Sequence, residues 1–291
     1  MEFFVQQLAN GVMMGSIYCL LVVGLVIILS MMDIVNFAHG QLAKLAGYIT
    51  IFAMNRLGLN FLLTILICVI VMAIIAFGLE KAVIRPARKK KLPLLIAGIA
   101  TVGMALALEE IAAIAFGRNQ ESVFAPWGGE SVRLGFIQTS LIRLIIPLIV
   151  VVLVAGLFLF LFRTRVGKAL RAVSQDSEAT ALQGINVDNI LSIGFMLSVG
   201  LAALAGTLLA QMRSMDPYMG VAISNKGFAI IIVGGMMSLP GAIAAAFLLG
   251  IGEVMVSGYV GANWADLFFF GMMVIVLLVR PNGLFGGGHL K

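Results

Sequence analysis

Residues 8–32 read LANGVMMGSIYCLLVVGLVIILSMM, a run of 25 residues without a single charged side chain. A helix needs about 20 predominantly apolar residues to cross the roughly 30 Å hydrocarbon layer of a membrane, so this stretch is long enough to span it. No basic residue precedes the run, and no small-residue cleavage site follows it. We therefore interpret the run as a retained membrane span and not as a removed leader.

Similar apolar runs recur along the whole chain. Six further full-length spans are expected at 61–79, 92–116, 141–162, 190–212, 240–258 and 262–279, with two shorter apolar pieces at 41–54 and 226–239. The 291 residues are 62% hydrophobic and only 11% charged, which excludes a soluble domain. Open strands cannot cross a membrane because their edges would be unsatisfied, so the sequence predicts an all-α polytopic membrane protein with about 8–9 transmembrane helices, some of them short or broken. One transmembrane permease domain would cover residues 1–291.

The distribution of charge predicts the orientation of this bundle. Segments 80–91, 163–189 and 280–291 carry net charges of +5, +1 and +2, whereas the whole chain carries +6, so the remainder is negative. Basic residues gathered in short loops mark the cytoplasmic side of a membrane protein and argue against a nucleic-acid partner. We expect these three segments to be cytoplasmic and 117–140 to be extracytoplasmic. Counting the spans then places the amino terminus outside.

A polar interruption, DIVNFAHG at 33–40, separates two apolar pieces. It can form a tight surface loop in which Asn36 and His39 cap helix ends. It can also form an unwound stretch inside the membrane whose backbone faces a cavity. In the second case Asn36, Phe37, His39 and Gly40 would line the solute path, and Asn36 would be placed to hydrogen bond a solute. Gly40→Leu is then expected to impair transport without disturbing assembly.

Charged residues also fall within the expected spans: Glu109, Glu110, Lys226, Glu253 and Asp266. An ionised carboxylate that faces lipid at the centre of a helix costs about 2.5 to 3.5 kcal/mol, so at least one residue of the adjacent glutamate pair should face protein or water. These residues either form a proton or cation relay or lie near the interface in ion pairs. For the two glutamates the candidate partners are Arg118 and Arg143.

The basic segment 163–189 is too long for a simple connection and predicts two short helices, at 167–173 and 178–183. The polar cluster between them suits helix capping, and Gly184 suits a helix stop. Short helices are marginal in water, so we expect this segment to pack on a partner; the alternative is an idle amphipathic loop on the membrane surface. Ala179 favours close approach, and charged residues surround it: Arg171, Asp176 and Glu178.

The sequence contains no recognisable catalytic constellation. It has only two histidines, no phosphate-binding G-x-x-x-x-G-K-[ST] loop and no G-x-S-x-G elbow. Cys19 and Cys68 stand alone in apolar segments without metal-ligand spacing. We therefore expect a transport subunit that is not an enzyme and has no metal site. Any ATP hydrolysis would take place on another chain.

Four separated motifs carry a family resemblance: NFAHGQ at 36–41, the stretch 167–186, VGG at 233–235 with LPGA at 239–242, and RPNGLFG at 280–286. In order and spacing they resemble the permease family of branched-chain amino acid ABC importers, LivH type. Glu178-Ala179-Thr180 followed by Gly184 is similar to the EAA-and-glycine loop that importer permeases insert into their ATPases. The match is not strict, because Thr180 stands where that loop usually has Ala and no Leu-Pro follows.

This resemblance implies a multi-pass subunit of the bacterial inner (cytoplasmic) membrane within a heteromeric complex. The implied partners are a second related permease, two cytoplasmic ATPase subunits that bind ATP and Mg, and a periplasmic solute-binding protein; this chain would need no cofactor of its own. The segment 163–189 would couple to the ATPases through five residues: Arg171, Asp176, Glu178, Ala179 and Gly184.

The implied translocation path lies between the two permeases, and the implied solute is a branched-chain amino acid. Urea, short amides and small organic acids are alternative solutes for permeases of this kind. A channel or facilitator is a further alternative, but it would need a continuous polar pore, and too few intramembrane polar residues stand at helical spacing to line one.

Overall fold

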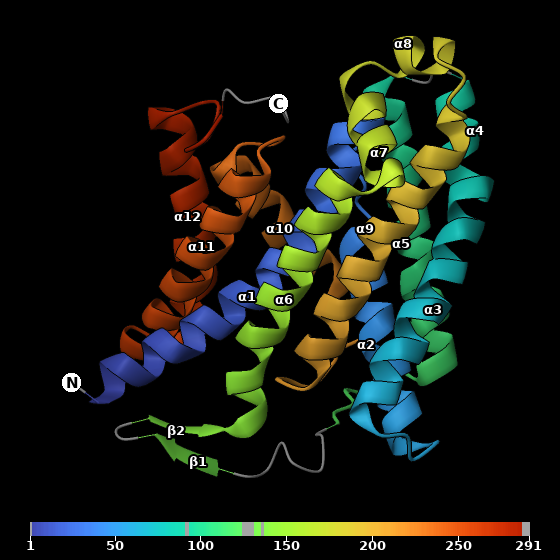
Figure 1. The fold of residues 1–291 in the computed structure, drawn as a ribbon. Coiled ribbons are helices and arrows are strands. Elements are labelled where there is room, and N and C mark those ends of the chain that lie inside the picture. Colours follow the sequence, from blue (N-terminus) through green and yellow to red (C-terminus); the bar gives the residue numbers. More distant parts are fainter. Residues whose placement is uncertain (1, 91–92, 124–130, 135–136, 287–291) are drawn as a thin grey trace.

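The structure is a computed structural model that describes residues 2–90, 93–123, 131–134 and 137–286. Within these residues seven helices are long and apolar enough to cross a membrane: α1 (Glu2–Met32), α3 (Phe61–Leu79), α5 (Leu94–Phe116), α6 (Leu141–Arg163), α9 (Val187–Ala210), α11 (Leu239–Tyr259) and α12 (Ala262–Val279). Two shorter helices, α2 (His39–Asn55) and α10 (Gly220–Gly234), complete the bundle (Figure 1). The predicted all-α polytopic architecture is confirmed, with each predicted full-length span matched by a long helix.

The short elements gather at the two ends of the bundle. A π-helical turn η1 (Glu80–Ile84) continues α3 and leads into α4 (Arg85–Lys89), and α6 is followed by α7 (Arg165–Gln175) and α8 (Ser177–Leu182). These elements lie at one end of the bundle, whereas the antiparallel pair β1 (Ser131–Leu134) and β2 (Ile137–Ser140) lies at the other (Figure 1). The two basic segments therefore share one end, and the start of α1 lies at the opposite end, as the charge pattern predicted.

The second short helix lies earlier in the chain than predicted. We expected an apolar piece at 226–239, but α10 spans Gly220–Gly234. Gly235, with φ of 105°, ends it in a backbone conformation that favours glycine. A new helix, α11, then begins after Ser238, whose hydroxyl accepts a hydrogen bond from the Gly241 amide at 3.2 Å. The two residues after Gly235 are also apolar, so the apolar run in the sequence continues past the point where α10 ends. Hydropathy alone therefore does not predict this helix end.

Helix α1 is the central element of the core. It is buried almost continuously from Gly15 to Leu29 and packs against α9 and α11. Its contact with α11 is close because both helices carry glycine there: a Cβ added to Gly250 would lie 2.6 Å from the Cα of Gly15. Lipid is as apolar as the helix surfaces, so the hydrophobic effect does not drive membrane helices together. Close contacts between small residues such as these provide the van der Waals packing that holds the bundle together.

The orientation can be tested with single cysteines at the two ends. Lys90 follows α4 and Asn119 follows α5, and both are exposed. We expect Lys90→Cys to react with an impermeant thiol reagent only from the cytoplasmic side, and Asn119→Cys only from the outer side. The native Cys19 and Cys68 are buried and should remain unlabelled. Labelling of both positions from the same side would contradict this topology.

Candidate functional site

The polar interruption re-enters the bundle. Nε2 of His39, the first residue of α2, lies 3.0 Å from the carbonyl oxygen of Leu21 on α1. A carbonyl oxygen only accepts, so His39 carries a proton on Nε2 in this bond. Leu21 precedes Met32, the last residue of α1, by three helical turns, or about 16 Å at 1.5 Å per residue. The chain therefore turns back before α2 begins, which confirms a helix break inside the bundle instead of a tight surface loop.

Side chains from two other helices satisfy the backbone of this break. The Ser224 hydroxyl on α10 accepts from the Gly40 amide and donates to the Phe37 carbonyl, both at 2.9 Å. The Thr101 hydroxyl on α5 accepts from the Phe37 amide at 3.1 Å and lies 3.0 Å from the Val35 carbonyl oxygen. Non-helical backbone in a membrane protein needs such partners because lipid offers none. Specific hydrogen bonds thus hold the break in place and connect α2 to α5 and α10.

The predicted path residues divide into buried and exposed groups. Asn36 and His39 are 1% and 0% exposed, and Gly40 is also buried. Within the described part of the chain, Nδ2 of Asn36 and Nδ1 of His39 have no hydrogen-bond partner. Phe37, by contrast, is 39% exposed and packs against Phe228 with ring centroids 5.0 Å apart. The break therefore presents an aromatic surface and holds two polar groups behind it. That these residues line a solute path stays a prediction.

A cavity of about 540 Å³ opens beside the start of the break. Its walls come from the end of α1, the first residues of the break, α4, α5 and the turn before α11: Leu29, Met32, Asp33, Ile34, Val35, Ala87, Arg88, Ala97, Met236 and Met237. The volume lies within the roughly 300 to 1,000 Å³ usual for small-molecule sites. The cavity adjoins the basic end of the molecule and is large enough for a small solute.

A second polar group follows the break along α2. Gln41 and Lys44 are fully buried one helical turn apart; the Gln41 amide donates to Glu109 at 2.6 Å, and the Lys44 ammonium donates to the Pro217 carbonyl at 2.6 Å. Glu110 is exposed. Among the described residues neither candidate partner, Arg118 or Arg143, forms an ion pair with Glu109, whose carboxylate accepts from Gln41, 68 residues away in sequence. The three-residue spacing of Gln41 and Lys44 was the signal that the sequence reading missed.

The remaining intramembrane charges form a network that joins four helices. Lys226 of α10 lies 2.5 Å from Glu253 of α11 and 3.0 Å from Asp266 of α12. The Tyr18 hydroxyl of α1 donates to the other oxygen of Glu253 at 2.7 Å. The side chains of Lys226 and Glu253 are only 15% and 13% exposed. Pairing within the protein therefore accounts for these charges, which supports the ion-pair interpretation of them.

Gly40 sits where no side chain fits. A Cβ at this position would overlap the Gly220 carbonyl oxygen and the Ser224 amide nitrogen, both of which are backbone atoms of α10. The expectation that Gly40→Leu spares assembly therefore has to be replaced. We expect even Gly40→Ala to destabilise the protein by roughly 1 to 3 kcal/mol through overpacking.

Thermal unfolding and the yield of monodisperse protein measure this loss. Gly156→Ala on α6 is the matched control, because a Cβ there meets nothing within 4 Å. Equal stability of the Gly40→Ala and Gly156→Ala variants would show that α2 and α10 do not meet as described.

The coupling segment forms two helices joined at Asp176. One oxygen of the Asp176 side chain accepts from the amides of Glu178 and Ala179, both at 2.9 Å, and so caps α8. After α8, Gly184 adopts φ of 81°, which confirms its predicted role as a helix stop. Helix α8 projects at the basic end of the molecule, next to α7 (Figure 1).

The predicted coupling residues differ in their surroundings. Asp176, Glu178, Ala179 and Gly184 are all exposed. Arg171 is turned onto its own chain: its Nε donates to the Leu161 carbonyl at 3.2 Å, and its guanidinium lies 4.4 Å from the centre of the Phe162 ring.

Leu182 is 90% exposed at the end of α8 and was not singled out from the sequence. A large apolar residue in a short helix whose other residues are small or polar is a signal that points to it. A projecting helix with such a residue at its tip is suited to insertion into a partner.

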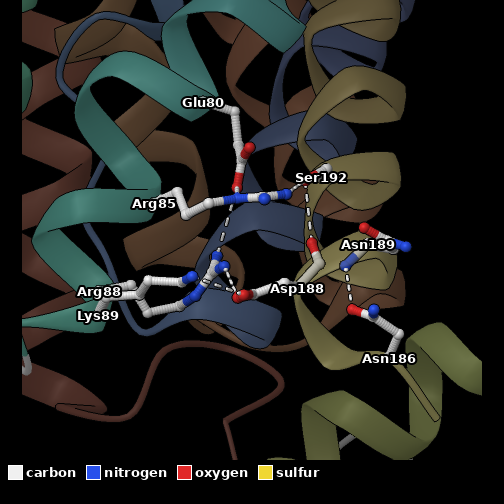
Figure 2. A network of polar contacts seen from close by, with 8 residues as sticks. All are labelled: Glu80, Arg85, Arg88, Lys89, Asn186, Asp188, Asn189 and Ser192. Carbon is white, nitrogen blue, oxygen red and sulfur yellow. Dashed lines mark hydrogen bonds and ion pairs between the residues drawn. The ribbon is translucent and has the colours of Figure 1, made fainter.

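A polar network ties the segment that follows α8 to α4. Asp188, in the first turn of α9, lies 2.5 Å from Arg88, and the fully buried Glu80 lies 3.3 Å from Arg85. Arg85 in turn donates to the Ser192 hydroxyl at 2.7 Å. Figure 2 shows these side chains converging between the η1–α4 segment and α9. The network therefore connects the start of α9 to α4, which lines the cavity beside the break.

A bundle of membrane-length helices, a helix broken in its interior and a capped helix projecting from its basic end together define a polytopic membrane transport subunit. Comparison with known sequences specifies the class further. The model of the family described as branched-chain amino acid transport system, permease component, matches residues 7–277. The chain belongs to this family, and the resemblance expected from its four motifs is confirmed.

Individual relatives agree with this assignment. LivH of Escherichia coli K12, a high-affinity branched-chain amino acid transport system permease protein, is 30% identical over 98% of this chain and 96% of its own length. BraD of Pseudomonas aeruginosa is 30% identical over 97% of this chain and 96% of its own. LivM of E. coli K12 is 30% identical over 49% of this chain and 34% of its own. Among solved structures, PsaBC from Streptococcus pneumoniae in complex with Fab is similar with a TM-score of 0.51, covering 95% of this chain and 92% of that one; at 13% identity this likeness concerns the fold alone.

Proposed function

We propose that this chain is the transmembrane permease subunit of an ATP-driven ABC importer for branched-chain amino acids in the bacterial inner membrane. The observation that carries the proposal is α8: a capped, exposed helix at the basic end, bearing Leu182 at its tip and bounded by Gly184. A helix this short is marginal in water, and Thr180 is its one buried residue, so a partner would add to its stability. Full-length relatives named as branched-chain amino acid permeases supply the solute class.

The partners follow from the same reasoning. Two cytoplasmic ATPase subunits would supply ATP hydrolysis with Mg, which this chain has no motif to perform, and one of them would receive α8. The match of about half of this chain to LivM favours a second, related permease. A periplasmic solute-binding protein would deliver the amino acid at the opposite end. The translocation path would run between the two permeases, past the exposed Phe37 and into the cavity beside the break.

Coupling would work as a lever. Closure of the ATPases would move α8, and Asn186, whose side chain accepts from the Asn189 amide at 3.1 Å, transmits this to the start of α9. The contact of Asp188 with Arg88 carries the movement to α4. Because Arg88 also lines the cavity beside the break, the opening of this cavity would change with the state of the ATPases.

Affinity purification of the tagged chain from its native membrane tests the proposal. We expect a second permease and two ATPase subunits to co-purify, and the solute retained by the cognate binding protein to be a branched-chain amino acid. If the binding protein retains urea, a short amide or a small organic acid instead, the assignment to an importer stands and the proposed substrate changes. Recovery of the chain as a transport-active assembly without ATPases would favour a channel or facilitator and contradict the proposal.

A further inference from the structure

A second cavity lies on the other side of the α1 end, facing α6. It measures about 260 Å³ and is walled by α1, α6, α7 and the turn before α11: Val26, Ile27, Ser30, Met31, Phe158, Leu161, Phe162, Leu170, Arg171, Ser174, Met237, Ser238, Leu239 and Pro240. Its walls are mainly apolar, and Arg171 is the single charged residue among them. The cavity shares Met237 with the cavity beside the break, and no residue of α8 lines it.

The cavity adjoins the lipid-facing side of the bundle at the basic end. On α6, Leu159 is 62% and Phe162 is 42% exposed, whereas Leu157 and Leu161 are buried. The outer face of α6 therefore makes few contacts within the chain and is open to lipid in a membrane, and its last turn forms one rim of the cavity. Met237, on the opposite rim, is 39% exposed. An apolar chain from the surrounding membrane can thus reach the cavity without crossing water.

The charge along the segment that leads to Arg171 is one-sided. Arg163, Arg165, Lys168 and Arg171 follow one another within nine residues that contain no acid. None of these four side chains is ion-paired with another residue that the structure describes. Lys168 and Arg171 are three residues apart on α7, so they are neighbours on its surface.

The groups that hold the Arg171 side chain in place, a backbone carbonyl and an aromatic ring, carry no negative charge. Its Nε donates to the Leu161 carbonyl, and its guanidinium stacks near the Phe162 ring, so the two terminal nitrogens remain available as donors. An apolar cavity with an oriented guanidinium at its edge and further basic residues beside it matches an amphiphile with an anionic head. Basic pockets between helices on the cytoplasmic side of membrane proteins have this chemistry.

We infer that this cavity binds an anionic phospholipid of the cytoplasmic leaflet, with an acyl chain between α1 and α6 and the phosphate at Arg171. The site lies where α6 passes into α7, directly before the coupling helix. It therefore goes beyond the proposed transport function and places a lipid against the segment that joins the membrane domain to its partners.

Photo-crosslinking of the assembled complex tests this inference. The complex is placed in phosphatidylcholine vesicles that contain a minority of phosphatidylglycerol, with a photoactivatable acyl chain on one lipid or the other, and crosslinks are mapped by mass spectrometry. We expect phosphatidylglycerol to be enriched at 158–174 over its share of the membrane. On the same helix, 148–152, where Leu148 and Val152 face outward, should label in proportion to lipid abundance.

Arg171 provides the decisive variants. Since a basic residue near the surface attracts anionic lipid by about 1 kcal/mol, Arg171→Gln should lower the enrichment about fivefold, and Arg171→Lys should retain most of it. Labelling in proportion to abundance at 158–174, or enrichment unchanged by Arg171→Gln in a complex that still assembles, would overturn the inference. Labelling that appears only when the ATPases are removed would also overturn it, because a protein surface would then fill the cavity.

Discussion

Ala179→Trp should leave the protein folded and stop it from importing solute. Ala179 is exposed on α8, so the indole has room within its own chain, and under the proposed assembly it would meet the groove of the ATPase. Overpacking a buried joint costs roughly 1 to 3 kcal/mol, which weakens the contact by about fivefold to more than a hundredfold. We expect ATP hydrolysis to become uncoupled from uptake, or the ATPases to be lost on purification.

Gly184→Trp should also uncouple ATP hydrolysis from uptake or release the ATPases, for two reasons. Besides its bulk, a non-glycine residue at φ of 81° carries about 1 to 2 kcal/mol of backbone strain, so the stop of α8 would also change. Glu178→Gln should be much milder, because an exposed charge pair contributes only about 0 to 1 kcal/mol.

The measurements are solute uptake and ATPase activity in reconstituted vesicles, with co-purification of the ATPases. Ala262→Trp, at an exposed position at the start of α12 and away from α8, is the matched control and should transport normally. Wild-type uptake by both the Ala179→Trp and the Gly184→Trp variants would remove α8 from the coupling mechanism.

Glu253→Ala should have the largest effect on stability. It leaves Lys226 with only Asp266, whose side chain is 70% exposed, and leaves the Tyr18 hydroxyl without its acceptor. Breaking a buried ion pair by removing one partner typically costs about 3 to 5 kcal/mol. Because the network joins α1, α10, α11 and α12, we expect a lower unfolding temperature and poor recovery of the intact complex.

Two further variants separate charge from packing. Asp266→Asn changes the exposed member of the network and should be close to wild type. Replacing both partners, Lys226→Met with Glu253→Met, should restore much of the stability lost in Glu253→Ala, because the two buried charges are removed together and the charge that loses its partner, Asp266, is exposed. A Glu253→Ala protein with the unfolding temperature of the wild type would show that the network contributes little.

The elements that the sequence predicted well are those with a local signal. Full-length spans follow from apolar length, and the two helices of 163–189 follow from the capping residue Asp176 and the stop at Gly184. The boundary of α10 was wrong because the apolar pattern continues past Gly235 while the backbone does not.

The interior of the candidate site had no such signal. Ser224 binds the backbone at Gly40 across 184 residues, and Gln41 reaches Glu109 across 68. These contacts depend on how α2, α5 and α10 pack in three dimensions, and no local periodicity encodes that packing. The polar composition of 33–40 left a break inside the membrane and a tight surface loop as alternatives, and it did not indicate the helices that hold the break.

ATP-dependent uptake of a labelled branched-chain amino acid into vesicles tests the central claim most directly. The vesicles would contain this chain with its partner permease and ATPases, and the cognate binding protein would be supplied on the outer side. We predict uptake only when ATP and the ATPases are both present, and its loss when either is omitted. Uptake by this chain that continues at the same rate without ATP or without the ATPases would contradict the assignment to an ABC importer.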